Sequence, residues 1–279
     1  MPQPVQTAFP TAILNDGREM PQFGFGTSGI DNDQAEDKVG EAIKRGYRLI
    51  DTAAMYENEE GVGKGVGSRH DIFLTTKIWN DRQGHAEAKA AFREALARMG
   101  RDEVDLLLIH WPAPGKDLYV DTWKALIELR EDGRVKSIGV SNFMPEHIDR
   151  LIAETGVTPA VNQIQVHPMW QQRAVRAYNR DKGIITQSWS PLGSGQLLRH
   201  PVLTQIAEEL EVPVASVILR WHLQHGLAPI PKTETPERMS DNLDAMRVVL
   251  NRDHMARIDA LDHPEGRLGP DPMVHGNDA

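Results

Sequence analysis

Four side chains with complementary chemistry stand at or just after the ends of apolar segments. Residues 46–50 (GYRLI) end on Asp51, Tyr56 follows five residues later, and two later runs end on Lys77 and His110. Tyrosine is a weak acid with a pKa of about 10, and a nearby lysine favours the phenolate and lowers that pKa. An aspartate can hold the lysine in place, and a histidine can orient a substrate oxygen or assist the proton. Together they would form a proton donor for carbonyl reduction, if a hydride comes from elsewhere.

Each of these groups also has a structural interpretation. An Asp–Lys pair at strand ends is more often structural than catalytic, and a single histidine at a strand end is no better than even. The catalytic interpretation therefore depends on whether the fold brings all four side chains to one place.

The rest of the chain alternates short apolar runs with helical segments. The expected strands cover residues 22–27, 47–51, 72–77, 104–110, 135–142, 160–165, 184–190 and 227–233. The expected helices cover residues 33–45, about 58–66, 84–99, 119–132, 145–155, 171–181, 202–210, 213–225, 236–246 and 252–261. Eight strands alternating with helices over about 250 residues predict an α/β fold, a single (β/α)8 TIM barrel. Its active site would lie where the carboxyl ends of the strands meet, which places Asp51, Lys77 and His110 on one rim.

Two features flank this repeat. Asn15-Asp16-Gly17 predicts an N-terminal β-hairpin ahead of the first barrel strand, and the helices near the C-terminus exceed what eight β/α units need. No linker or change of composition divides the chain, so residues 1–279 are expected to form one domain. Residues 1–10 and about 266–279 are expected to be flexible, the latter segment being polar and rich in glycine and proline.

A doubly wound sheet is the competing architecture. Residues 24–29 (GFGTSG) match the GxGxxG spacing of a dinucleotide-binding turn, and Asp51 follows at about the distance of a ribose-binding acid. The preceding residues make a poor buried strand, however, and the segment Gly29–Asn32 delays the next helix. The eightfold alternation outweighs this single match.

Composition excludes several classes of partner and of catalytic site. The net charge of −9 argues against nucleic acid or an anionic membrane as the main partner. The absence of cysteine excludes disulfides, thiolate catalysis and cysteine-based zinc sites, and the histidines at 110, 167 and 222 lack metal-ligand spacing, so no metal is expected. No apolar run approaches 18 residues and the N-terminus lacks a signal-peptide pattern. A soluble cytoplasmic protein is therefore the expectation.

Seven segments carry a resemblance to a known family. GYRLIDTAAMYENEEGVG, TTKIWN, LLLIHWP, GVSNF, VNQIQVHP, SWSPLGSG and PKTETPERMSDN resemble aldo-keto reductases, in order from about residue 12 to about 262. KIWNDR, HWPAP, WQQR and LRWHLQ are most similar to the bacterial branch that includes 2,5-diketo-D-gluconate reductases.

The resemblance implies a catalytic tetrad of Asp51, Tyr56, Lys77 and His110, with Tyr56 as the general acid in reduction. It implies NADPH as cofactor, with NADH less favoured, bound extended across the barrel top without a Rossmann fold. The residues implied to bind the cofactor are Thr27, Ser141, Asn142, Gln163, Trp189, Ser190, Leu192, Ser194, Lys232, Thr233, Arg238 and Asn242. Ser28, Trp79 and Trp111 would line the substrate pocket, bordered by the loop Pro112–Tyr119 and the tail Gly266–Ala279.

The expected function is reduction of a small-molecule aldehyde or ketone by a monomeric enzyme. Candidate substrates are keto-sugar acids such as 2,5-diketo-D-gluconate, α-dicarbonyls and small aldehydes. The alternative is a nucleotide-binding regulatory module with slow or no turnover. One departure from the family pattern is Glu234, because an acid beside the 2′-phosphate would repel it and weaken the preference for NADPH.

Overall fold

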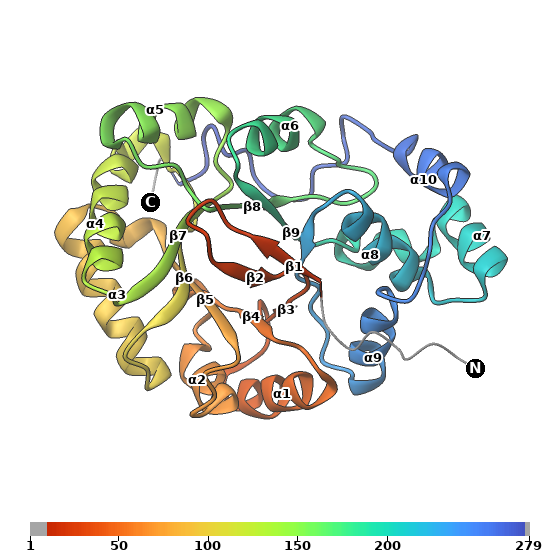
Figure 1. The fold of residues 1–279 in the computed structure, drawn as a ribbon, viewed down its shortest axis with the longest axis horizontal. Coiled ribbons are helices and arrows are strands. Elements are labelled where there is room, and N and C mark those ends of the chain that lie inside the picture. Colours follow the sequence, from red (N-terminus) through yellow and green to blue (C-terminus); the bar gives the residue numbers. More distant parts are fainter. Residues whose placement is uncertain (1–9, 277–279) are drawn as a thin grey trace.

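The computed structural model describes residues 10–276, and its centre is one eight-stranded parallel sheet (Figure 1). The strands follow one another in chain order, from β3 to β10. They are β3 (Phe25–Gly26), β4 (Leu49–Asp51), β5 (Phe73–Ile78), β6 (Val104–Ile109), β7 (Val135–Ser141), β8 (Val161–Gln165), β9 (Ile185–Trp189) and β10 (Ala228–Pro229).

The first and last strands of this sheet are joined into a closed barrel. The backbone N–H of Gly24 donates to Pro229 O at 3.0 Å, and that of Gly26 donates to Pro231 O at 3.2 Å. A Cβ atom on Gly26 would lie 2.9 Å from the carbonyl oxygen of Ile230, so the close approach requires glycine. The predicted (β/α)8 barrel is confirmed, and the GFGTSG segment belongs to its closing seam rather than to a phosphate-binding turn that opens a helix.

Both strands at this seam are shorter than predicted. Residues 22–27 contribute only Phe25–Gly26 to the sheet, and residues 227–233 contribute only Ala228–Pro229. Pro229 and Pro231 have no amide hydrogen, so they cannot donate to a neighbouring strand. Regular pairing therefore stops after two residues on each side.

The predicted N-terminal hairpin covers one end of the barrel. Strands β1 (Thr11–Ile13) and β2 (Glu19–Pro21) pair antiparallel and lie across the ring of strands in Figure 1. Leu14 and Met20 pack in one cluster with inward-facing barrel residues such as Leu106 and Leu108. The hairpin thus closes the floor opposite the carboxyl ends of the strands.

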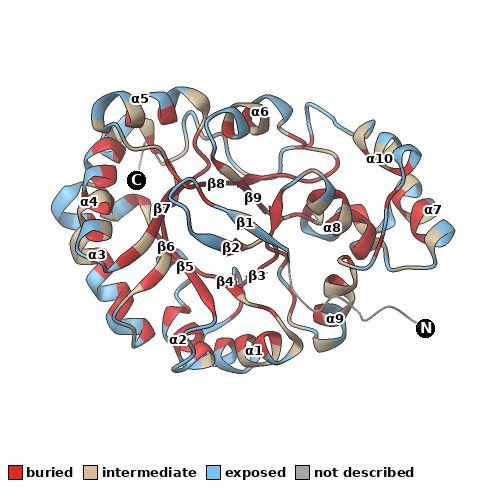
Figure 2. Cartoon of the chain, in the orientation of Figure 1, coloured by how far each residue is buried: buried red, intermediate tan, exposed pale blue. Residues whose placement is uncertain are grey.

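Helices surround the barrel (Figure 1). They are α1 (Asn32–Arg45), α2 (Glu59–Val66), α3 (His85–Met99), α4 (Tyr119–Glu131), α5 (Pro145–Thr155), α6 (Arg173–Asp181), α7 (Pro201–Leu210), α8 (Val214–Gln224), α9 (Pro236–Asp244) and α10 (Arg252–Asp259). The buried stripes of the helices next to the barrel face the strands and their exposed stripes face outward (Figure 2), whereas α7 packs on α8 and α10 packs on α7. Within residues 10–276 no helix combines the length and apolar character needed to cross a bilayer.

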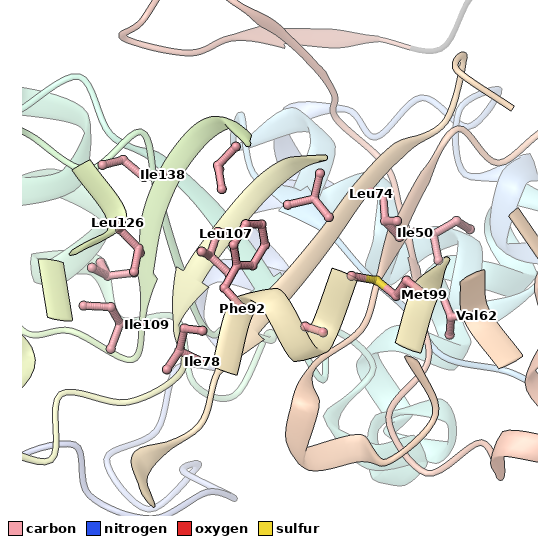
Figure 3. Packing of buried hydrophobic residues seen from close by; sticks show 14 of the residues in the cluster. Ile50, Val62, Leu74, Ile78, Phe92, Met99, Leu107, Ile109, Leu126 and Ile138 are labelled. Carbon is pink, nitrogen blue, oxygen red and sulfur yellow. The ribbon is translucent and has the colours of Figure 1, made fainter. Parts of the chain in front are cut away.

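The packing between helices and strands follows from the alternation of side chains along each strand. In β6, Leu107 and Ile109 point outward into a cluster with Phe92 of α3 and Leu126 of α4 (Figure 3), whereas the intervening leucines point into the barrel. Because both faces of β6 are buried, the segment is apolar almost throughout, and this made it recognisable as a strand.

Candidate active site

The four predicted catalytic side chains meet at the carboxyl ends of the strands. Lys77 Nζ lies 2.6 Å from Asp51 Oδ1 and 3.4 Å from the Tyr56 hydroxyl. It also donates to the carbonyl oxygen of Thr52 at 2.9 Å. Asp51 ends β4 beside Thr75 of the adjacent parallel strand β5, and Lys77 lies two residues further along β5, so both side chains lie at the carboxyl ends of these strands. The fold thus brings together Asp51 and Lys77, which are 26 positions apart in the sequence.

A buried asparagine fixes the loop that carries Tyr56. Asn58 Nδ2 donates to the carbonyl oxygens of Thr27 and Ile30, at 2.9 Å each, and its Oδ1 accepts from the Thr52 hydroxyl at 2.7 Å. Two of these hydrogen bonds tie the residue that follows the turn Ala54–Tyr56 to the segment after β3, and the third ties it to the residue after β4. Asn58 was not predicted as a site residue, although the position of its amide group between Tyr56 and the start of α2 was a signal for one.

Amide side chains hold Asp51 from the opposite side. Gln163 Nε2 donates to Asp51 Oδ2 at 2.7 Å and also lies 2.6 Å from Gln187 Oε1. Gln163 was predicted to contact the cofactor, whereas Gln187 was not identified. Both oxygens of Asp51 thus have partners, which is what a buried carboxylate requires.

His110 completes the group through ring contacts. Its ring centroid lies 5.7 Å from that of Tyr56 and 4.9 Å from that of Trp79, both edge-on. Burial and then the positive charge of Lys77 hold the pKa of His110 well below its ordinary value, so the imidazole is neutral near pH 7. Its Nδ1 atom is buried without a hydrogen-bond partner among the described residues.

Burial and neighbouring charges together shift the pKa values of Tyr56 and Lys77. Burial raises the pKa of the Tyr56 phenol above its ordinary value of 10, and the opposing effect of Lys77 does not overcome it. The expectation that Lys77 lowers this pKa is right for the lysine's own effect but wrong for the net direction. Burial alone would lower the pKa of Lys77, but Asp51 and Tyr56 raise it above its ordinary value. The site therefore combines a neutral phenol with a charged ammonium group.

A cavity of about 830 Å³ extends from the tetrad. The predicted residues that line it are Ser28, Asp51, Tyr56, His110, Trp111, Ser141, Asn142, Gln163, Trp189, Ser190, Leu192, Ser194, Lys232, Thr233, Arg238 and Asn242. Three predicted residues stand behind the lining. Lys77 lies beneath Tyr56, Trp79 packs on His110, and the hydroxyl of Thr27 donates to Asp51 O at 3.0 Å.

Near the tetrad, hydrogen bonds order the polar wall of the cavity. Asn142 Nδ2 donates to the carbonyl oxygen of His110 at 3.1 Å, and its Oδ1 accepts from the indole N–H of Trp189 at 2.8 Å. Ser141 donates its hydroxyl to Gln163 O at 2.8 Å. These contacts set the orientation of the Trp189 ring beside amide and hydroxyl groups.

The far end of the cavity is charged. Lys232 Nζ forms an ion pair with Glu234 Oε1 at 2.5 Å, and a hydrogen bond from Lys232 lowers the pKa of Glu234. Arg238 has no ion pair or hydrogen-bond partner among the described residues. Asp241 also lines this end and was not identified from the sequence, nor were Pro213, Val214 and Ala215 at the start of α8.

The C-terminal tail borders the opposite, tetrad end. Leu268 and Gly269 donate their backbone N–H groups to Gln165 Oε1 at 3.1 and 2.9 Å, and His275 packs on Trp111. Residues 1–9 and 277–279, which were expected to be flexible, lie outside the described residues. For residues 10 and 266–276 flexibility stays a prediction.

Comparison with known proteins shows what the chain resembles as a whole. Residues 20–263 match the model of the Aldo/keto reductase family. Glyoxal reductase of Bacillus subtilis is 47% identical over 94% of this chain and 96% of its own length. Methylglyoxal reductase DkgA of Escherichia coli is 44% identical over 96% of this chain and 99% of its own length. Among solved structures, a mutant of Gox0644 in complex with NADPH is 48% identical, covers 96% of this chain and 98% of its own, and has a TM-score of 0.94.

Proposed function

The chain belongs to the aldo/keto reductase family, and from this we propose that it reduces the carbonyl group of small aldehydes and ketones with NADPH. The observation that carries the proposal is the grouping of Asp51, Tyr56, Lys77 and His110 at one end of a cavity that reaches Arg238 at the other. An acid for the substrate oxygen and a cationic contact for a phosphate thus share one space.

The tetrad has separate tasks in this reaction. Tyr56 holds a proton on its hydroxyl oxygen, because burial keeps the phenol neutral, and gives it to the substrate oxygen as negative charge develops there. Lys77, held by Asp51, stabilises the phenolate that is left. His110, as a neutral imidazole, orients the substrate oxygen towards Tyr56 by an N–H hydrogen bond.

The lining of the cavity fits a nicotinamide dinucleotide phosphate. Its volume of about 830 Å³ lies in the range of cofactor sites. Asn142, Ser141 and Gln163 offer donors and acceptors for a carboxamide, and the guanidinium of Arg238 suits a phosphate. When bound, NADPH supplies the hydride. Ser190, Leu192 and Ser194 would hold its pyrophosphate, and Asn242 its adenine; Thr27 is proposed as a further contact.

The substrate class follows from the relatives and from the tetrad end of the cavity. The similar proteins from Bacillus subtilis and Escherichia coli are named glyoxal and methylglyoxal reductases. Aromatic rings of Tyr56, His110 and Trp111 enclose this end. We therefore propose α-dicarbonyls as the first substrates to test, ahead of keto-sugar acids. Ser28, on the rim, leaves room beside Tyr56.

The decisive experiment follows NADPH consumption by absorbance with methylglyoxal as substrate, repeated with NADH. Turnover with NADPH supports the reductase. Binding of NADPH, seen as quenching of tryptophan fluorescence, with no turnover of any carbonyl would instead support a nucleotide-binding regulatory module. Light scattering of the same sample would test the expected monomer, and fractionation of cells would test the expected cytoplasmic location.

Removing the cations at the far end should weaken NADPH binding selectively. We expect Lys232→Ala with Arg238→Ala to raise the Kd of NADPH at least about tenfold, since charge-assisted hydrogen bonds are worth roughly 1.5–3 kcal/mol each. The Kd of NADH should change little, because NADH lacks the 2′-phosphate. Fluorescence titration measures both values, and equal losses for the two cofactors would contradict the 2′-phosphate assignment.

Removing the acid at this end should have the opposite effect. Glu234→Gln frees Lys232 from its ion pair and is expected to lower the Kd of NADPH about two- to fivefold, the range of a half-exposed pair. The Kd of NADH should stay the same. Glu237→Gln, an exposed acid of α9 outside the cavity lining, is the matched control. A result in which both variants shift the Kd equally would assign the effect to overall charge.

A further inference from the structure

We propose that His275 is a specificity-determining residue that donates a hydrogen bond to a second oxygen of the substrate, on the carbon next to the reacting carbonyl. This inference rests on the proposed reductase function and extends it to the substrate. It is carried by the contacts that hold the tail and by the position of the His275 ring.

The tail is anchored to the barrel before it reaches His275. Gln165, the last residue of β8, accepts the backbone N–H groups of Leu268 and Gly269 on its side-chain oxygen. Gly269 also lies against the Trp189 ring, so closely that an added Cβ would be 2.6 Å from its Cη2 atom. The tail therefore passes over the ring beside the proposed nicotinamide site.

Asp271 then builds the turn that presents His275. Its carboxylate pairs with Arg267 at 2.9 Å and accepts the N–H of Met273 at 3.0 Å. Its backbone oxygen accepts the N–H of His275 at 2.9 Å. Local hydrogen bonds thus fix the backbone at His275, and the ring packs against Trp111.

The ring of His275 lies against the two tryptophans predicted to wall the substrate pocket. Its centroid is 4.4 Å from that of Trp111 and 6.4 Å from that of Trp79, and Trp79 in turn packs on His110. Its positive charge, when present, contributes to the low pKa of His110. His275 therefore stands one ring away from the group proposed to orient the reacting oxygen.

The cationic side chains near this end already have other partners. Lys77 is paired with Asp51 beneath Tyr56, and Lys116 donates to the backbone oxygen of Asn80 at 3.2 Å. The cations in the cavity lining, Lys232 and Arg238, belong to its far end. Neither ring nitrogen of His275 bonds to a side chain or backbone group of residues 10–276, so an N–H is available for a substrate oxygen.

Burial lowers the pKa of His275 below its ordinary value, so near pH 7 the ring would act as a neutral donor. A second carbonyl oxygen, as in a 1,2-dicarbonyl, matches such a donor. An aldehyde without a second oxygen gains nothing from it. The structure therefore favours substrates that carry two neighbouring oxygens.

The test compares methylglyoxal with propanal, which has the same three-carbon chain but one oxygen, in the full-length enzyme with NADPH. His275→Phe keeps a ring against Trp111 but removes the donor. We expect it to raise the KM for methylglyoxal about three- to tenfold, as for one neutral hydrogen bond. The kcat for both substrates, and the KM for propanal, should stay within about twofold. His275→Gln, which keeps a donor, should restore most of the preference for methylglyoxal.

The outcomes separate this inference from the reductase itself. Equal changes of KM for the two substrates, or no change in His275→Phe and His275→Ala, would overturn the role of His275 while wild-type turnover stands. Absence of turnover by the wild type would overturn the proposed function instead. Thermal unfolding of each variant shows whether a loss comes from a failure to fold.

Discussion

Replacing Tyr56 by phenylalanine should lower kcat for carbonyl reduction by about 10²- to 10⁴-fold, the usual contribution of a positioned general acid. The variant keeps the aromatic ring and its edge-on contact with His110 but lacks the proton that burial retains on the hydroxyl. The change is measured as NADPH consumption with methylglyoxal at saturating concentrations of both.

Binding of NADPH provides the control for this variant. Because the hydroxyl group of Tyr56 lies next to Lys77 and away from the charged end of the cavity, the Kd of NADPH should stay nearly the same. If Tyr56→Phe retained more than a tenth of wild-type kcat, the general acid would have to be another group. In that case His110 would be the next residue to replace.

Replacing Lys77 by methionine should destabilise the protein by about 3–5 kcal/mol, because it leaves the carboxylate of Asp51 buried without its counter-charge. Both side chains of the pair are almost fully inaccessible. Gln163 can still donate to Asp51, but one neutral hydrogen bond does not replace a paired cation. The free energy of unfolding, measured by urea titration, gives the size of the loss.

A double variant tests the cause of that loss. Asp51→Asn with Lys77→Met removes both charges and should recover most of the lost stability while remaining inactive. If the free energy of unfolding of Lys77→Met lay within about 1 kcal/mol of the wild-type value, water or a neighbouring group would have to stabilise the buried charge of Asp51. Activity alone cannot distinguish these cases, since both variants lack the lysine beside Tyr56.

The tetrad was predictable from sequence because a parallel barrel places all strand ends on one rim. Asp51, Lys77 and His110 end or follow strands whose apolar runs were easy to recognise, so their convergence followed from the fold alone. Tyr56 required only that its loop be short. The helices were found for a similar reason, since their buried stripes recur at helical spacing.

Other parts of the site depend on contacts that no local pattern reveals. Asn58 fixes the Tyr56 loop through backbone groups of Thr27 and Ile30, about 30 residues earlier. The tail carrying His275 is held by Gln165, about 100 residues before it. Repulsion between Glu234 and a phosphate was expected, but its ion pair with Lys232 depends on the path of the chain after β10.

The seam between β3 and β10 links binding in the cavity to the stability of the closed barrel. Among the backbone groups of residues 10–276, only the N–H groups of Gly24 and Gly26 donate across it, because the prolines opposite them cannot. Gly26 and Ser28 on one side, and Ile230 and Lys232 on the other, all line the cavity. A molecule that fills the cavity would therefore touch both edges of the seam, and by mass action its binding would resist the opening of the ring. The bound ligand would therefore stabilise the closed barrel. In a cell with little of this ligand, a larger fraction of the protein would have an open seam than in a cell with plenty of it.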